Sequence, residues 1–193
     1  MSEGLDIASA KAELRRAIRA ARRGIDARER ERAALAVMRK LMLLDRIVNA
    51  KLVLAYNPMK YELDITPAVR ALQKRGVRVA YPLCIEEGGL RLFVPTHESA
   101  FRVGAYGIME PDPGLCAEVS PDELDAIILP AIGFDAQCRR LGQGGGYYDR
   151  LLARAACFTA AVGFDCQLVE RVPCEETDKT VDVVVTPGGI LSV

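Results

Sequence analysis

The sequence predicts an α/β fold, specifically a three-layer α/β/α sandwich around a mostly parallel sheet. From residue 51 onward, short runs rich in β-formers alternate with helical segments, which is typical of parallel βαβ units. The runs at 125–130 and 181–186 are almost continuously apolar, as expected for central strands covered on both faces. With 193 residues, 50% of them hydrophobic, the chain can bury one sizeable core. We therefore expect a single domain over residues 1–193.

The first 48 residues are expected to form a helical segment that precedes an α/β core at 49–193. Apolar residues of the first helix recur at three- and four-residue steps: Leu14, Ile18, Ala21 and Ile25. A second run with this spacing follows a break at 24–26: Leu35, Met38, Leu41 and Met42. Lys11 and Arg15 are four residues apart, so they share one face of the first helix.

The rest of the chain alternates strands and helices. Strands are expected at 52–56, 77–81, 90–94, 125–130, 159–164 and 181–186, with a helix at 67–74. The Gly- and Pro-rich section after the third strand is expected to be irregular through Gly114. In open α/β sheets, ligands bind at the carboxyl ends of the strands. The loops after residues 56, 130 and 164 are therefore expected to line one crevice.

Composition excludes several classes of protein. The 26 basic and 26 acidic residues balance, but residues 1–50 hold twelve Lys/Arg against seven Asp/Glu. Such a basic segment suits nucleic acid, although it lacks interleaved aromatic residues, so a solvated helix face is the alternative. No apolar run could span a bilayer or act as a secretory signal, which predicts a cytoplasmic protein. The six cysteines are scattered and there is one histidine, so a zinc site is not expected.

The stretch at 139–150, RRLGQGGGYYDR, is the most informative part of the chain. Its four glycines leave backbone N–H groups open to a bulky anion, while Arg139 and Arg140 offset phosphate charge. Asp149 could hold a magnesium ion that bridges phosphates. The spacing fits neither the P-loop nor the dinucleotide-binding fingerprint, and a glycine-rich strand-to-helix turn without a ligand is the alternative. We therefore predict a polyphosphate cradle that opens a helix.

Four ordered pieces of the chain resemble the 5-formyltetrahydrofolate cyclo-ligase family. They are KAELR at 11–15, KYELDIT at 60–66, PAIGFDAQCRRLGQGGGYYDR at 130–150 and VPCEETDKTVDVVVTP at 172–187. The resemblance implies ATP-dependent cyclisation of 5-formyltetrahydrofolate to 5,10-methenyltetrahydrofolate, with release of ADP and phosphate through an iminophosphate-like intermediate. It also implies a fold related to sugar-phosphate isomerases and coenzyme A transferases.

The resemblance also implies roles for individual residues. Arg140, Tyr148 and Asp149 would be catalytic, and Asp149 and Asp178 would bind Mg²⁺. The ATP-binding set would be Lys11, Arg15, Arg140, Gly142, Gln143, Gly144, Gly145, Gly146, Tyr147, Tyr148 and Asp178. The set that contacts the folate substrate would be Met59, Tyr61, Glu62 and Asp64.

Some of these roles have structural alternatives. Tyr147 and Tyr148 could contact ligand or pack at the start of a helix. Glu62 and Asp64 are two residues apart, so only one is expected to face the site, and Glu62 is favoured. Asp64 could instead lie at a helix N-terminus near the dipole, just before Pro67, and Met59 could pack in the core. The family often has His where this chain has Thr177, and a basic or aromatic residue where it has Gln143.

Two other functions remain compatible with the sequence. One is a non-catalytic relative that binds folate or nucleotide. The other is a nucleic-acid-binding α/β protein that uses its basic N-terminal segment. For the enzyme we expect small-molecule substrates, no nucleic acid or membrane partner, and a monomer or weak homo-oligomer.

Overall fold

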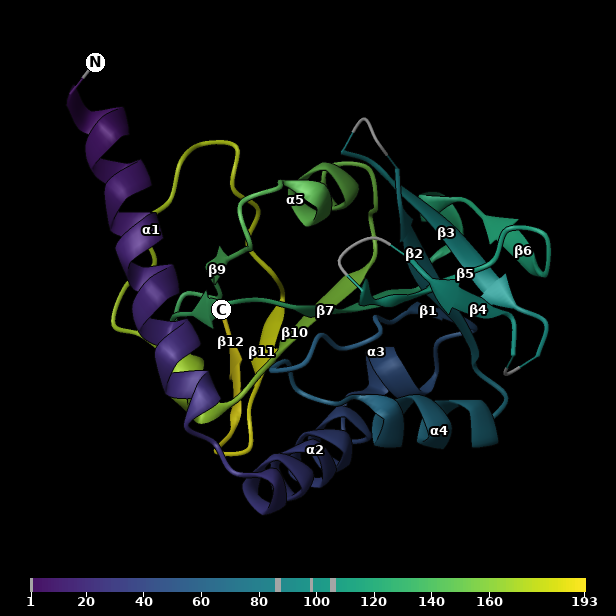
Figure 1. Cartoon of the computed structure of the whole chain (residues 1–193). Helices are drawn as coiled ribbons and strands as arrows, with labels where there is room; N and C mark the ends of the chain where they lie inside the picture. Colours follow the sequence, from purple (N-terminus) through teal and green to yellow (C-terminus); the bar gives the residue numbers. More distant parts are fainter. Residues whose placement is uncertain (1, 86–87, 98, 105–106) are drawn as a thin grey trace.

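The structure is a computed structural model that describes residues 2–85, 88–97, 99–104 and 107–193 (Figure 1). Three helices open the chain: α1 (Ser2–Arg23), α2 (Ala27–Leu41) and α3 (Asp45–Val48). Asp26 ends the break between the first two, because its Oδ1 accepts a hydrogen bond from the Glu29 backbone N–H at 2.8 Å and so caps α2. The predicted helices and the break at 24–26 are confirmed, and the short α3 was not predicted.

One large sheet forms the centre of the molecule. Its strands are β1 (Leu52–Leu54), β2 (Arg78–Cys84), β3 (Leu90–Pro95), β6 (Cys116–Val119), β7 (Ala126–Pro130), β10 (Phe158–Val162), β11 (Val183–Val185) and β12 (Ile190–Ser192). Among the described residues it has eight strands, in the order β12-β11-β10-β7-β1-β2-β3-β6. The strands from β11 to β2 are parallel, whereas β12, β3 and β6 pair antiparallel at the edges.

Two apolar layers cover the sheet, because successive residues of a strand point to opposite faces. Val53, Ile128 and Val185 belong to one buried cluster, together with residues of α2 and α4 (Thr66–Lys74). Leu54 and Leu129 belong to a second cluster, together with residues of α5 (Tyr147–Leu152). Figure 1 shows α2 and α4 below the sheet and α5 above it. The predicted three-layer α/β/α fold with a mostly parallel sheet is confirmed.

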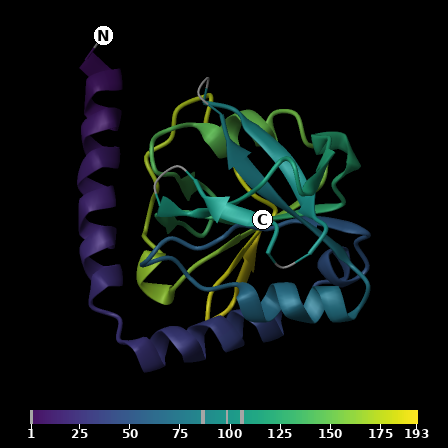
Figure 2. The same cartoon turned by 45° about the vertical axis from the view of Figure 1, so that its right-hand side comes forward.

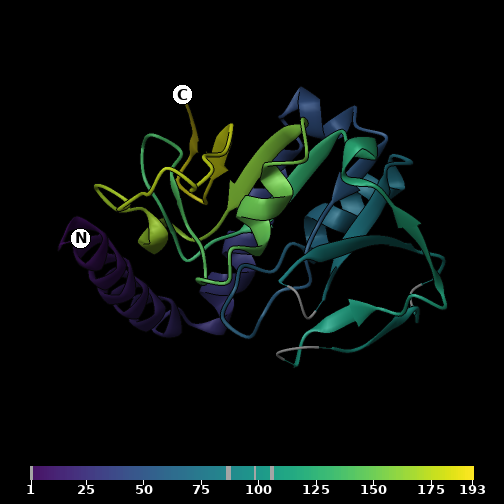
Figure 3. The same ribbon diagram turned by 90° about the horizontal axis from the view of Figure 1, so that it is seen from above.

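Helix α1 stands at one side of these layers (Figure 2). Ile18 is buried there with Ile132, Leu141 and Val172, and Leu14 packs against the same small cluster. Seen from above, the helix runs beside the loops that follow the central strands (Figure 3). Its apolar residues thus anchor it, which leaves its basic residues beside the carboxyl ends of the sheet.

The prediction of an irregular section after the third strand is wrong. The strands β4 (Phe101–Val103) and β5 (Met109–Pro111) form an antiparallel hairpin, and β6 then joins the edge of the large sheet. The glycines of this section led to the prediction of a loop, yet Gly107, with φ +70°, belongs to the connection between two paired strands. No helix among the described residues is long and apolar enough to cross a membrane.

Candidate active site

The glycine-rich stretch lies at the carboxyl edge of the central strands. After β7 the chain forms a small hairpin of β8 (Gly133–Phe134) and β9 (Arg140–Leu141), and residues 142–146 connect β9 to α5. Asp135 is fully buried at the hairpin turn, where it accepts hydrogen bonds from Arg139 Nε at 2.6 Å and from the Val172 backbone N–H at 2.8 Å. This carboxylate joins the hairpin to the 172–178 segment.

Two glycines give this loop its path. Gly144 has φ +109° and Gly146 has φ +66°, and residues with a side chain rarely adopt such values. Gly146 directly precedes the first turn of α5. The prediction that this loop leads into a helix is therefore confirmed, and that helix, α5, is six residues long.

Four basic residues of α1 form a stripe along the helix face that borders this loop. They are Lys11, Arg15, Arg19 and Arg22, at steps of four, four and three residues. Arg15 Nε donates to the carbonyl of Gly142 at 2.8 Å, and Arg19 Nη2 donates to Gln143 Oε1 at 2.7 Å. Arg22 Nε donates to the carbonyl of Tyr61 at 3.0 Å. The stripe thus reaches from the glycine loop to the loop after β1.

Lys11 occupies the first position of the stripe. Its Nζ lies 2.7 Å from Glu175 Oε2 and 2.6 Å from Asp178 Oδ2, and the lysine is 7% exposed. Burial opposes the charged form, but the hydrogen bonds to Asp178 and Glu175 outweigh it and raise the pKa of Lys11. The ammonium is therefore charged and fixed beside the glycine loop.

Arg140 in β9 and Asp149 in α5 form a second ion pair, which joins the two ends of the glycine loop at 142–146. Arg140 Nη2 lies 2.6 Å from Asp149 Oδ1, which also accepts the Lys179 backbone N–H at 3.3 Å. Arg140 is 5% exposed, and within the described residues its buried Nε has no hydrogen-bond partner. Its guanidinium also lies 5.9 Å from the ring centre of Tyr148. A buried donor without an acceptor suits a ligand oxygen.

The carboxylates of Asp149 and Asp178 offer oxygen ligands of the kind that Mg²⁺ prefers. Among the described residues, the hydrogen bonds of Asp149 reach Oδ1 and those of Asp178 reach Oδ2. Over all the residues that the structure describes, no three His, Cys, Asp or Glu side chains form a metal-binding cluster. Protein-bound Mg²⁺ commonly has one or two carboxylates plus phosphate and water ligands, and this donor set fits that arrangement.

The loop between β1 and α4 carries the predicted substrate contacts. Glu62 Oε2 accepts the Met59 backbone N–H at 3.0 Å, and Gln143 Nε2 lies 3.4 Å from Glu62 Oε1. Burial, with the nearby charge of Glu62, raises the pKa of Tyr148. The glycine loop and the Glu62 loop therefore lie side by side.

Asp64 and Tyr61 have different surroundings. Asp64 Oδ1 accepts the Thr66 backbone N–H at 2.8 Å just before α4, whose N-cap residue is Ile65 and has no side-chain cap. This carboxylate near the helix N-terminus is the arrangement that was the alternative to substrate contact. The ring of Tyr61 lies 5.4 Å from the guanidinium of Arg30. Asp64 is thus engaged with its own backbone, whereas Glu62 faces the glycine loop.

Sequence reasoning missed two members of the stripe. Arg19 and Arg22 continue the spacing of Lys11 and Arg15 along the same face of α1, so helical periodicity of the basic residues was the signal that could have identified them. The structure also places Glu175 on Lys11, a contact across 164 residues that no local pattern indicates.

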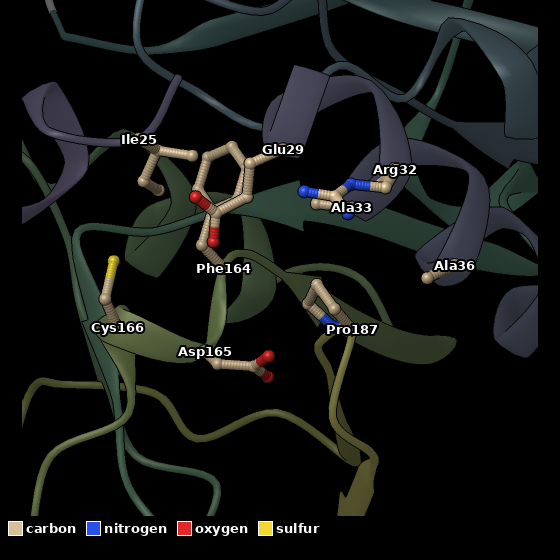
Figure 4. Close-up of a pocket in the computed structure, with 9 residues that line it drawn as sticks. All are labelled: Ile25, Glu29, Arg32, Ala33, Ala36, Phe164, Asp165, Cys166 and Pro187. Atoms are coloured by element: carbon tan, nitrogen blue, oxygen red, sulfur yellow. The ribbon is translucent and has the colours of Figure 1, made fainter. Parts of the chain in front are cut away.

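A pocket of about 290 Å³ opens elsewhere, between α2 and the ends of β10 and β11 (Figure 4). Its lining includes Arg32, Phe164 and Cys166. None of the predicted site residues lines it. The pocket lies at the same edge of the sheet as the glycine loop but is a separate feature.

Comparison with known proteins agrees with the resemblance. The model of the 5-formyltetrahydrofolate cyclo-ligase family matches residues 7–187. The 5-formyltetrahydrofolate cyclo-ligase of Escherichia coli K12 is 33% identical over 178 residues, covering 90% of this chain and 98% of the relative. The Mus musculus enzyme of that name is 29% identical, covering 91% and 93%.

Solved structures give the same result. The NMR structure of Aquifex aeolicus 5,10-methenyltetrahydrofolate synthetase has a TM-score of 0.83 at 35% identity, covering 94% of this chain and 92% of that one. The Mycoplasma pneumoniae 5,10-methenyltetrahydrofolate synthetase, at 20% identity and a TM-score of 0.76, supports the fold alone and covers 92% and 98%. By sequence and by structure, the chain belongs to the 5-formyltetrahydrofolate cyclo-ligase family.

Proposed function

We propose that this chain catalyses the ATP-dependent cyclisation of 5-formyltetrahydrofolate to 5,10-methenyltetrahydrofolate, with release of ADP and phosphate. The observation that carries the proposal is the adjacency of two loops. The glycine loop, with its Arg140–Asp149 pair, suits a polyphosphate, and Gln143 in that loop lies 3.4 Å from Glu62 in the other. ATP bound at the glycine loop and folate bound at the Glu62 loop would therefore lie in contact.

The chemistry explains why such adjacency is needed. The formamide oxygen of the substrate is a poor leaving group, so it first attacks the γ-phosphorus and ADP departs. N10 of the folate then attacks the formyl carbon and loses its proton, the ring closes, and the oxygen leaves with phosphate. No covalent enzyme intermediate is required. The protein must hold the formyl oxygen in line with the γ-phosphate and neutralise the transferring group.

The basic groups of the site suit the phosphates. Arg140 presents a buried guanidinium, and Lys11 presents a fixed ammonium at the side of the loop. Backbone N–H groups of the loop would add donors whose orientation does not change during transfer. Asp149 and Asp178 would hold Mg²⁺, which supplies positive charge to the phosphate oxygens when it is bound.

The other loop suits the folate. Glu62 presents a carboxylate that could accept hydrogen bonds from N–H groups of the pterin ring. Met59 is half-buried beside it and offers an apolar surface. Tyr148 lies between the loops, with a pKa raised by burial, so its hydroxyl stays protonated and can donate to the substrate.

The arrangement of α1 disfavours the nucleic-acid alternative. Lys11 and Arg22 are 7% and 4% exposed, Lys11 Nζ lies 2.6 Å from Asp178 Oδ2, and Arg22 Nε donates to the carbonyl of Tyr61. Their burial keeps them from the extended phosphate backbone of a nucleic acid, which binds exposed basic groups. A cytoplasmic location and a monomer or weak homo-oligomer belong to this proposal.

One assay tests the proposal. Purified protein is mixed with 5-formyltetrahydrofolate, ATP and Mg²⁺, and methenyl-folate absorbance is followed over time. We expect absorbance to rise only when all three are present. Binding of both ligands without product would instead support a non-catalytic relative. Binding of neither ligand would overturn the proposal.

A further inference from the structure

Gln143 uses both ends of its side-chain amide to join three parts of the site. Its Oε1 accepts from Arg19 Nη2 at 2.7 Å, and its Nε2 lies 3.4 Å from Glu62 Oε1 and 3.9 Å from Met59 Sδ. The reverse orientation would set amide N–H groups against the Arg19 N–H and the amide oxygen against a carboxylate oxygen. The partners therefore fix the amide in this direction.

The backbone that carries Gln143 is itself held at the phosphate side. Arg15 Nε donates to the carbonyl of Gly142, the residue directly before it, at 2.8 Å. The residue directly after it, Gly144, has φ +109°. A phosphate bound to the N–H groups of this loop would thus set the position of the Gln143 backbone. Because the side chain is anchored to Arg19, that position determines where its Nε2 meets Glu62.

Glu62 is positioned by few other contacts. Its Oε2 accepts the Met59 backbone N–H at 3.0 Å, while Gln143 supplies the hydrogen bond to Oε1. Among the described residues, Glu62 forms no ion pair within 4.0 Å. The bond from Gln143 is therefore the direct side-chain restraint on the direction of this carboxylate.

We propose that Gln143 is a positioning residue that couples the two substrates, so that bound nucleotide orients Glu62 for the folate and bound folate tightens the nucleotide. This inference rests on the proposed function, since it requires both ligands to bind. It gives Gln143 a role beyond phosphate contact. Coupling of this kind is a free energy shared by two sites, so each ligand must change the affinity of the other by the same factor.

The test measures this factor directly. The dissociation constant of 5-formyltetrahydrofolate is determined with and without a saturating magnesium complex of a non-hydrolysable ATP analogue. We expect about tenfold tightening in the wild-type chain, within the usual range of coupling between sites. In Gln143→Met, which keeps the length of the side chain but loses the amide, the factor falls below about twofold. The reciprocal titration must give the same factors.

Matched variants separate coupling from general damage. Gln73→Met alters an exposed glutamine of α4 and should keep the wild-type factor. Arg19→Met breaks the other end of the bridge and should lower the factor, whereas Arg16→Met, an exposed residue of the same helix, should not. A merely structural role for Gln143 would lower thermal stability and leave the ratio unchanged.

The outcomes distinguish the two proposals. If the wild-type chain binds both ligands with a factor near one, or if Gln143→Met keeps the wild-type factor, the coupling role is overturned and the proposed function stands. If the wild-type chain binds neither ligand, the proposed function itself fails. A lowered factor in both bridge variants, with controls unchanged, establishes Gln143 as the coupling residue.

Discussion

Lys11 Nζ lies 2.6 Å from Oδ2 of Asp178, although 167 residues separate the two in the chain. This ion pair links α1 to the 172–178 segment beside the glycine loop. Both residues were predicted to serve the same nucleotide, and a bound polyphosphate would compete with Asp178 for the ammonium.

The first prediction concerns this lysine. In Lys11→Met the KM for ATP should rise about 10- to 100-fold, because a hydrogen bond between charged groups contributes about 1.5–3 kcal/mol. The methionine keeps the apolar stem, so the fold should persist. Steady-state kinetics measure the effect, with Lys74→Met in the last turn of α4 as the control. An unchanged KM would remove α1 from the nucleotide site.

The second prediction concerns magnesium. Asp149→Asn keeps an acceptor for Arg140 but removes the negative charge, so kcat should fall about 100-fold, as for loss of one preorganised charge-stabilising group. The Mg²⁺ concentration for half-maximal rate should rise. A magnesium titration of the activity measures both values, and Asp45→Asn, at an exposed position of α3, is the control. Unaltered magnesium dependence would mean that Asp149 is not a ligand.

Asp149 and Lys11 show how much of the site can be predicted from local sequence patterns. The glycine loop indicated an anion site because its composition is local, and Asp149 lies within the same twelve residues. The contact of Glu175 with Lys11 joins distant segments, so it depends on how the 172–178 segment and α1 are brought together. The antiparallel edges of the sheet were missed for a similar reason, since pairing direction is set by neighbouring strands. The relation of the fold to sugar-phosphate isomerases and coenzyme A transferases stays a prediction.

The third prediction uses two glycines with positive φ. Gly144 has φ +109° in the glycine loop, and Gly76 has φ +84° in the turn between α4 and β2, where an added Cβ would meet nothing within 4 Å. Alanine at either position should cost about 1–2 kcal/mol of folding free energy, because both force a side chain into the left-handed region. Only Gly144→Ala should also raise the KM for ATP.

Thermal unfolding and ATP kinetics of both variants give the comparison. Similar losses of stability, with a kinetic defect confined to Gly144→Ala, would show that the loop conformation serves nucleotide binding. Equal kinetic behaviour of the two variants would contradict that role.

The fourth prediction concerns Asp135, the buried carboxylate under the glycine loop. Burial opposes its charge, but hydrogen bonds from the Val172 backbone N–H and from Arg139 outweigh this and lower the pKa of Asp135 below its ordinary value of 3.8. Because the pKa is lower in the folded chain than in the unfolded chain, the charged carboxylate stabilises the fold at pH values above 3.8. This stabilisation is lost as the pH falls through the pKa of the folded state. Asp135→Asn should therefore cost about 3 kcal/mol near neutral pH, since it removes the negative charge that pairs with Arg139.

Urea unfolding followed by circular dichroism, at pH values from neutral to below 3.8, measures this difference. The gap between wild type and Asp135→Asn should narrow as the pH falls below 3.8, because the wild-type carboxylate then takes up a proton and loses its advantage. Asp45→Asn, on the surface, should show no such gap. A gap that widens on acidification would mean that Asp135 is protonated in the folded chain at neutral pH, and the hydrogen bonds assigned to its charged form would then be wrong.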